Sequence, residues 1–387
     1  MSKKQNIRWV IAAIVSFIVT LTLYIQYDIE YKKTVETDVP SPSIAEESRK
    51  KQVVLSSDYV DTKISEFSEP QKSQTEDNTE AKDTETKEYS TKTEAEAAQP
   101  IEEKIELDVK LKAEDIYNID LMEENNIEPL DIESYKNTAN VIDSTLTEFA
   151  VNSSEISLAY YDFHNGEHYY INGDAFMTAA SVSKVNLAAL YIDQLEAGEI
   201  QLSSELAYSD SLFEAGDGKV TNQETKSAYT VEELLTEAII RSDNTAMNIL
   251  KKSYEDEHGN YRKAVLDFVG LDPNSDSYEE YLNSNVTSAQ LIEQVLIKIA
   301  SDDTYNGLIE LMTQTSPTQL FTRYVNGEMM ANKFGRYSNS VNDCGVYYEN
   351  GQPQYALVVL TDNVENADNF LETMNLRVNQ WFRHKYL

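Results

Sequence analysis

The tetrapeptide Ser181-Val182-Ser183-Lys184 places a serine hydroxyl and a lysine amine three residues apart, just before Leu187 and an apolar run. Apolar side chains recur there at helical spacing, which predicts a helix with one buried face. Side chains three residues apart on a helix are neighbours, with Cβ atoms about 5–6 Å apart. Because burial disfavours the ammonium form of lysine, a buried Lys184 could accept the proton of Ser181. The pattern predicts an active-site serine that needs no histidine.

Two further motifs separate this tetrapeptide from residues 48–51, where the same Ser-x-x-Lys pattern occurs in a polar stretch. Ser-Asp-Asn at residues 242–244 follows a helix-like segment over 231–240. Lys-Phe-Gly at residues 333–335 lies on a predicted strand. Taken alone, the first motif is also compatible with a helix N-cap cluster, and a lysine on an edge strand is commonplace.

The elements that must position these motifs follow from hydrophobic periodicity. A hairpin is predicted first, because two alternating segments surround Asn165-Gly166, a dipeptide typical of hairpin turns. Helical segments dominate from 181 to 311, and strands and an amphipathic helix follow them. The predicted segments are strands at 156–161, 168–171, 330–334, 344–348 and 355–361, and helices at 141–151, 231–250, 288–300 and 367–382. This order predicts an α+β fold with one antiparallel sheet and helices on its faces.

The three motifs, in this order and with this spacing, resemble the motif set of class A β-lactamases and penicillin-binding proteins. The resemblance covers about residues 140–387. It implies a β-lactamase-like antiparallel sheet flanked by helices. It also implies a serine hydrolase that forms an acyl-enzyme with a β-lactam or a peptidoglycan-like peptide.

The resemblance also implies a role for each motif residue. Ser181 would be the acylated nucleophile and Lys184 its proton acceptor. Ser242 would relay a proton to the leaving nitrogen, and Asn244 would hydrogen-bond the substrate amide. Lys333 would hold Ser242 in place and attract a substrate carboxylate.

Gly335 and Arg336 complete the substrate-binding set that the resemblance implies. The backbone N–H groups of Ser181 and Arg336 would form the oxyanion hole, in which one donor is worth about 3–4 kcal/mol. Two lysines near one site lower each other's pKa, which favours a neutral Lys184.

The chain departs from the family pattern at two places. Phe334 stands where the family has a threonine or serine whose hydroxyl holds the substrate carboxylate. Residues 279–283 fit the Glu-x-x-Leu-Asn pattern of class A enzymes, which makes Glu279 a candidate water activator for deacylation. However, Ser277 replaces the expected arginine, and a helix resumes early, at Thr287. Glu279 is therefore either catalytic or a solvated loop acid.

Composition excludes several other classes of function. The 387 residues include 32 Lys+Arg and 67 Asp+Glu, for a formal net charge of -35, so nucleic acid is a poor partner. Cys344 is the single cysteine, so no intrachain disulfide can form. The four histidines are scattered, and neither metal-ligand spacing nor a glycine-rich phosphate loop occurs. We expect no metal and no cofactor.

Residues 1–27 predict a cytoplasmic tip and a transmembrane anchor. Basic residues precede an uncharged segment over 9–25, about 17 residues that would span roughly 26 Å as a helix. A cleaved signal peptide is the alternative, although no A-x-A-like site follows. The positive-inside rule predicts a single-pass protein in the cell membrane, with its N-terminus in the cytoplasm and the catalytic domain outside.

Residues 28–136 predict an acidic low-complexity linker, because they hold too few large apolar side chains to offset chain entropy. The sequence does not decide whether a small part of this linker after residue 101 is ordered. Residues 137–387 form the predicted hydrolase domain.

Three functions are compatible with these residues. The first is a membrane-anchored extracytoplasmic serine hydrolase that hydrolyses β-lactams through an acyl-enzyme on Ser181. The second is a D,D-peptidase-like enzyme that acts on peptidoglycan peptides. The third is a non-catalytic cell-surface binding module on the same fold, which Phe334 favours and the intact serine and lysine set opposes.

Overall fold

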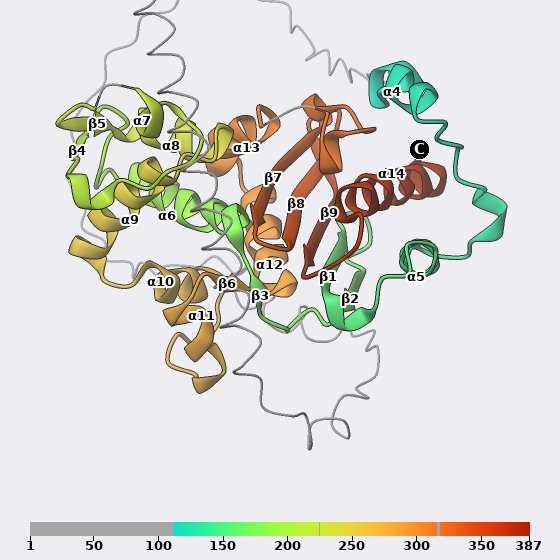
Figure 1. Cartoon of the computed structure of the whole chain (residues 1–387), viewed down its shortest axis with the longest axis horizontal. Coiled ribbons are helices and arrows are strands. Elements are labelled where there is room, and N and C mark those ends of the chain that lie inside the picture. The colour runs from blue at the N-terminus through green and yellow to red at the C-terminus, as the bar shows by residue number, and fades with distance from the viewer. Residues whose placement is uncertain (1–110, 224, 316–317) are drawn as a thin grey trace, which may run out of the picture. The chain divides into compact units, whose positions relative to one another are not determined.

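Five antiparallel strands form the central sheet of the part of the chain that the computed structural model describes, residues 111–223, 225–315 and 318–387. The spatial order of these strands is β2, β1, β9, β8, β7, so the first strands of the domain pair with the last (Figure 1). They are β1 (Ile156–Asp162), β2 (His168–Ile171), β7 (Met330–Tyr337), β8 (Ser340–Glu349) and β9 (Gln352–Thr361). The predicted anchor and the linker up to residue 110 lie outside the described residues.

The hairpin of β1 and β2 confirms the first sequence prediction. Tyr161 is opposite His168 in the register, and the turn between them contains Gly166. Gly166 has a φ of 72°, a backbone conformation that glycine adopts without a steric penalty. The three C-terminal strands also form where the sequence predicts them, and each is longer than predicted.

Helices cover both faces of the sheet, which is why both sets of alternating side chains in β9 are buried. The odd-numbered residues 355–359 pack in one apolar cluster with α5 (Thr138–Glu148) and α14 (Ala367–Tyr386). The even-numbered residues 356–360 pack in another cluster with α12 (Ala289–Ala300). Successive side chains of a strand point to opposite faces, so the two clusters lie on the two sides of the sheet. The predicted α+β fold is confirmed.

The second cluster continues into a helical region beside the sheet (Figure 1). Its helices are α6 (Lys184–Glu196), α7 (Lys219–Asn222), α8 (Val231–Ile240), α9 (Asn244–His258), α10 (Tyr261–Phe268), α11 (Glu279–Asn283) and α13 (Asn306–Thr313). Two short ladders also occur, β3 (Met177–Thr178) with β6 (Val286–Thr287) and β4 (Glu205–Ala207) with β5 (Ala228–Thr230).

The helical run predicted over 231–250 is interrupted at Ser242. Ser242 has a φ of 57°, which ends α8 and redirects the chain. Asp243 then caps α9, because its side chain accepts a hydrogen bond from the N–H of Ala246. The break places the Ser-Asp-Asn motif in a tight turn between two buried helices.

Residues 111–136 contain short helices that pack against the domain. These are α3 (Ala113–Ile116), α4 (Ile119–Glu124) and a 3-10 turn at Ile132–Ser134. Ile116 is buried in the cluster of α5 and α14. The Asn118 side chain donates hydrogen bonds of 3.1 and 3.0 Å to the carbonyl oxygens of Thr322 and Arg323. Among the described residues, no helix combines the length and apolar character that a membrane crossing requires.

Candidate active site

Ser181 and Lys184 meet at the junction between a 3-10 turn, η3 (Ala180–Ser183), and α6. The Nζ of Lys184 lies 3.0 Å from the Oγ of Ser181. The same Nζ donates to the backbone oxygen of Ser242 at 2.6 Å and to the Oδ1 of Asn244 at 2.7 Å. Three fixed partners hold the amine beside the serine hydroxyl, at a distance suited to proton transfer.

Burial brings the Lys184 amine close to neutrality. Lys184 is only 4% exposed, and most of its neighbours on α6 are apolar. Burial first, and then the nearby charge of Lys333, lower the pKa of Lys184 to about 7, against the opposing influence of Asp243, Glu214 and Asp217. A large fraction of Lys184 is therefore neutral near pH 7 and able to accept a proton.

Ser242 is held by the second lysine. The Nζ of Lys333 donates a short hydrogen bond to the Oγ of Ser242 and another, of 3.1 Å, to the carbonyl oxygen of Phe334. Lys333 is 1% exposed, and burial lowers its pKa to about 8, although Asp343 opposes this change. The left-handed backbone of Ser242 directs its carbonyl oxygen to one lysine and its hydroxyl to the other.

The free edge of β7 supports the backbone of the serine. β7 is the last strand of the sheet and pairs only with β8 there. A Cβ added at Gly335 would lie 2.4 Å from the backbone nitrogen of Ser181, so only glycine fits. Ala180, with a φ of 49°, turns this backbone toward the strand. The neighbouring Arg336 uses its guanidinium in a two-bond ion pair with Asp368, at 2.6 and 3.0 Å.

Phe334 packs away from the serine. Its side chain contacts the apolar cluster of α5 and α14, and it is not among the residues that line the cleft at Ser181. No hydroxyl therefore stands at this position of β7, as the sequence indicates. The ring of Phe334 lies 5.0 Å from the Nζ of Lys333.

A cleft of about 340 Å³ opens in front of Ser181 and Lys184. Asn244 and Arg336 line it as well, and so do side chains that the sequence motifs did not reveal. Among these additional residues are Glu214, Met247, Asn248, Lys251, Tyr261 and Arg262. Helical spacing from Asn244 is the signal that could have found residues 247, 248 and 251, because positions i, i+3, i+4 and i+7 share one face.

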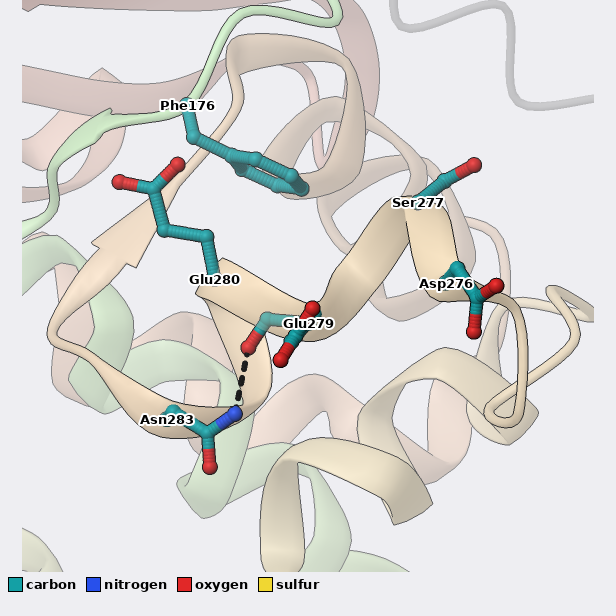
Figure 2. Close-up of a pocket in the computed structure, with 6 residues that line it drawn as sticks. All are labelled: Phe176, Asp276, Ser277, Glu279, Glu280 and Asn283. Carbon is teal, nitrogen blue, oxygen red and sulfur yellow. Dashed lines mark hydrogen bonds between the residues drawn. The ribbon is translucent and has the colours of Figure 1, made fainter.

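Glu279 lies in a different pocket. It begins α11 and lines an open pocket of about 520 Å³ with Phe176, Asp276, Glu280 and others (Figure 2). Asn283 donates to the backbone oxygen of Glu279 at 2.8 Å, as Figure 2 shows, rather than to its carboxylate. Within the described part of the chain, no hydrogen bond joins that carboxylate to Ser181 or Lys184.

The structure thus brings together Ser181, Lys184, Ser242, Asn244, Lys333, Gly335 and Arg336, and it leaves Glu279 apart. Among the described residues, no three His, Cys, Asp or Glu side chains are grouped so that they could hold a metal ion. Cys344, on the interior strand β8, is fully buried.

Comparison with known proteins places this geometry in a family. A model of the β-lactamase enzyme family matches residues 138–381. Among solved structures, a PBP-A variant in an acyl-enzyme complex with penicillin G is 18% identical, with 64% of this chain and 97% of that chain covered and a TM-score of 0.53. An ancestral class A β-lactamase is 20% identical, with 62% and 99% covered and a TM-score of 0.53.

A third similar structure is a β-lactamase from Chitinophaga pinensis, which is 17% identical, with 65% of this chain and 100% of that chain covered and a TM-score of 0.53. At these identities, the structural likeness shows a shared fold and nothing more. Among curated proteins, none matches the chain.

Proposed function

Because this chain belongs to the β-lactamase enzyme family, we propose that it is a serine hydrolase that forms an acyl-enzyme on Ser181 with a β-lactam or a peptidoglycan-like peptide. The observation that carries this proposal is the 3.0 Å contact between the Nζ of Lys184 and the Oγ of Ser181. A lysine with a pKa of about 7 is a competent base at this distance.

Acylation follows from the contacts around the serine. Neutral Lys184 takes the proton of Ser181, whose Oγ attacks the carbonyl carbon. The backbone N–H groups of Ser181 and Arg336 stabilise the oxyanion of the tetrahedral intermediate. When the carbon–nitrogen bond breaks, Ser242 gives its hydroxyl proton to the leaving nitrogen and regains a proton from protonated Lys184, so that the proton taken from Ser181 is relayed to the leaving group. Lys333 holds the Ser242 hydroxyl in place and attracts a substrate carboxylate.

Deacylation lacks an equivalent support in the cleft. Hydrolysis of the ester needs a water molecule and a base close to it. Among the described residues that line the cleft, Glu214 is the one acid, and it accepts a hydrogen bond of 2.9 Å from Asn248, while Glu279 lines the other pocket. We therefore expect fast acylation and slow release, which favours penicillin binding of the D,D-peptidase kind over rapid β-lactam hydrolysis.

We also propose that the domain acts outside the cell membrane. The basic N-terminus followed by the apolar segment 9–25 supports a single-pass anchor. The acidic stretch after it supports a long spacer. A peptidoglycan-like substrate would be found on that side of the membrane.

The test is to incubate the full chain with a fluorescent penicillin and with a chromogenic cephalosporin. We expect stable covalent labelling that is lost in Ser181→Ala and kept in Ser48→Ala, a control that removes the serine of the other Ser-x-x-Lys pattern. Rapid cephalosporin turnover would instead favour β-lactam hydrolysis. Absence of both labelling and turnover in the unchanged chain would favour the non-catalytic binding module.

A further inference from the structure

Two cations line the Ser181 cleft without an acidic partner among the described residues. Lys251, on α9, and Arg262, on α10, are half-buried and border the same cleft as Ser181. Within the described residues, neither side chain forms an ion pair or a hydrogen bond to an acid. By contrast, the next residue, Lys252, is exposed and pairs with Asp256.

The positions of these cations relative to the reacting atoms follow from the geometry of α9. Asn244, Asn248 and Lys251 occupy positions i, i+4 and i+7, so they share one face of the helix, and all three line the cleft. Seven residues of helix correspond to about 10 Å. The guanidinium of Arg262 lies 4.9 Å from the centre of the Tyr261 ring, and both residues line the cleft. The cleft thus runs from Ser181 along α9 to a cationic end.

The other charged groups of the cleft have contacts of their own. Glu214 keeps its negative charge and accepts a hydrogen bond from Asn248 at 2.9 Å, and Arg336 is paired with Asp368. Within the described residues, no ion pair joins Glu214 to Lys251 or Arg262. Lys184 is held by Ser181, Ser242 and Asn244. Lys251 and Arg262 give one partly buried cleft two positive charges, which attract a bound anion.

We propose that Lys251 and Arg262 form a subsite for an anionic group on the acyl side of the substrate, about three extended residues from the bond that Ser181 attacks. Asn244, which would bind the amide on that side, lies on the same helix face and sets the direction. The anionic group is a carboxylate or a phosphate, since a guanidinium binds both. This proposal names the substrate class for the proposed function and rests on it.

The test measures binding and not turnover, so it does not depend on acylation. The full chain carrying Ser181→Ala is titrated by calorimetry, at low and at high salt, with three peptides that end in D-alanyl-D-alanine. The peptides differ only at the third residue before the scissile bond, which is glutamine, glutamate or phosphoserine. We expect the glutamate or the phosphoserine peptide to bind about tenfold more tightly than the glutamine peptide at low salt.

Two double variants, each of which removes two positive charges, distinguish the subsite from a general effect of the protein's net charge. Lys251→Gln with Arg262→Gln should abolish the preference for the anionic peptide. Lys252→Gln with Lys263→Gln removes two exposed cations from the same two helices and should leave the preference unchanged. Thermal unfolding of both double variants identifies any that fail to fold, and single Lys251→Met and Arg262→Lys variants then replace them.

Equal affinity for the three peptides, or no detectable binding of any, would overturn the subsite. An equal loss of preference in both double variants would overturn it as well, because the whole surface would then be responsible. Labelling of the unchanged chain by fluorescent penicillin is read separately. A chain that labels but shows no preference keeps the proposed function and loses only this inference.

Discussion

In the Ser181 cleft, the reacting side chains come from η3, α6, the turn before α9 and the edge of β7, and the partners of Lys184 lie at 2.6–3.0 Å. In the Glu279 pocket, an exposed acid stands on a helix of five residues, and its carboxylate forms no hydrogen bond within the described part of the chain. The first region is fixed by buried elements, whereas the second depends on one short loop. The difference predicts that acylation is built into the core of the domain and deacylation is not.

The largest effect should come from removing the base of the first region. Lys184→Ala deletes the proton acceptor of Ser181, and general base catalysis contributes about 10²–10⁴-fold. We expect the rate of penicillin labelling to fall by that factor, while a matched change of an exposed lysine, Lys252→Ala, leaves it unchanged. A fall of less than about tenfold would show that another group activates Ser181.

A smaller loss should follow from crowding the backbone of the serine. In Gly335→Ala, the new methyl group would meet the backbone nitrogen of Ser181 at 2.4 Å and displace an oxyanion-hole donor. The loss of one donor lowers the acylation rate about 10²–10³-fold. Gly307→Ala is the control, because a Cβ at this helical position meets nothing within 4 Å and should stabilise the helix slightly. Normal labelling by Gly335→Ala would remove the edge of β7 from the site.

The pH dependence of acylation should reveal both lysines. Lys184 acts as a base only when neutral, so the rate should rise about tenfold per pH unit below its pKa of about 7. Lys333 attracts a carboxylate only when charged, so the rate should fall above its pKa of about 8. A substrate without a carboxylate should keep the acid limb and lose the alkaline one. An acid limb that persists in Lys184→Ala would assign this titration to another group.

The smallest effect is expected in the second region. If Glu279 stays outside the cleft, Glu279→Gln should change the breakdown rate of the acyl-enzyme by less than about twofold, as should the neighbouring Glu280→Gln. Both rates can be followed by the decay of a penicillin label. A slowing of tenfold or more in Glu279→Gln alone would mean that α11 closes over the cleft once substrate is bound, and the contrast between the two regions would disappear.

Sequence patterns predicted the first region better than the second for a physical reason. Ser181, Lys184 and Lys333 lie on elements whose periodicity is set by burial, so their neighbours in sequence show how they are placed. The fit of residues 279–283 to a catalytic pattern could not indicate where a short loop would hold Glu279. The break at Ser242 was only partly visible, because apolar residues recur on both sides of it, although Ser-Asp-Asn is also compatible with a helix N-cap cluster.

The two cations of the cleft, Lys251 and Arg262, differ in how far the sequence predicts them. Lys251 follows from Asn244 by helical spacing once α9 is known to begin at that residue. Arg262 could not be found in this way, since it comes from the next helix and reaches the cleft only through the packing of α10.

The order of the strands has a consequence for how the protein is made. β1 is hydrogen-bonded to β9, so that Ile156 is opposite Thr361, and the edge strand β7 that supports Ser181 reaches β1 only through β8 and β9. While the ribosome is still producing the chain, the serine and its lysine exist long before the strands that fix them. Contacts so distant in sequence slow folding. A product that stops before residue 352 should therefore carry the whole catalytic set and still fail to react with penicillin.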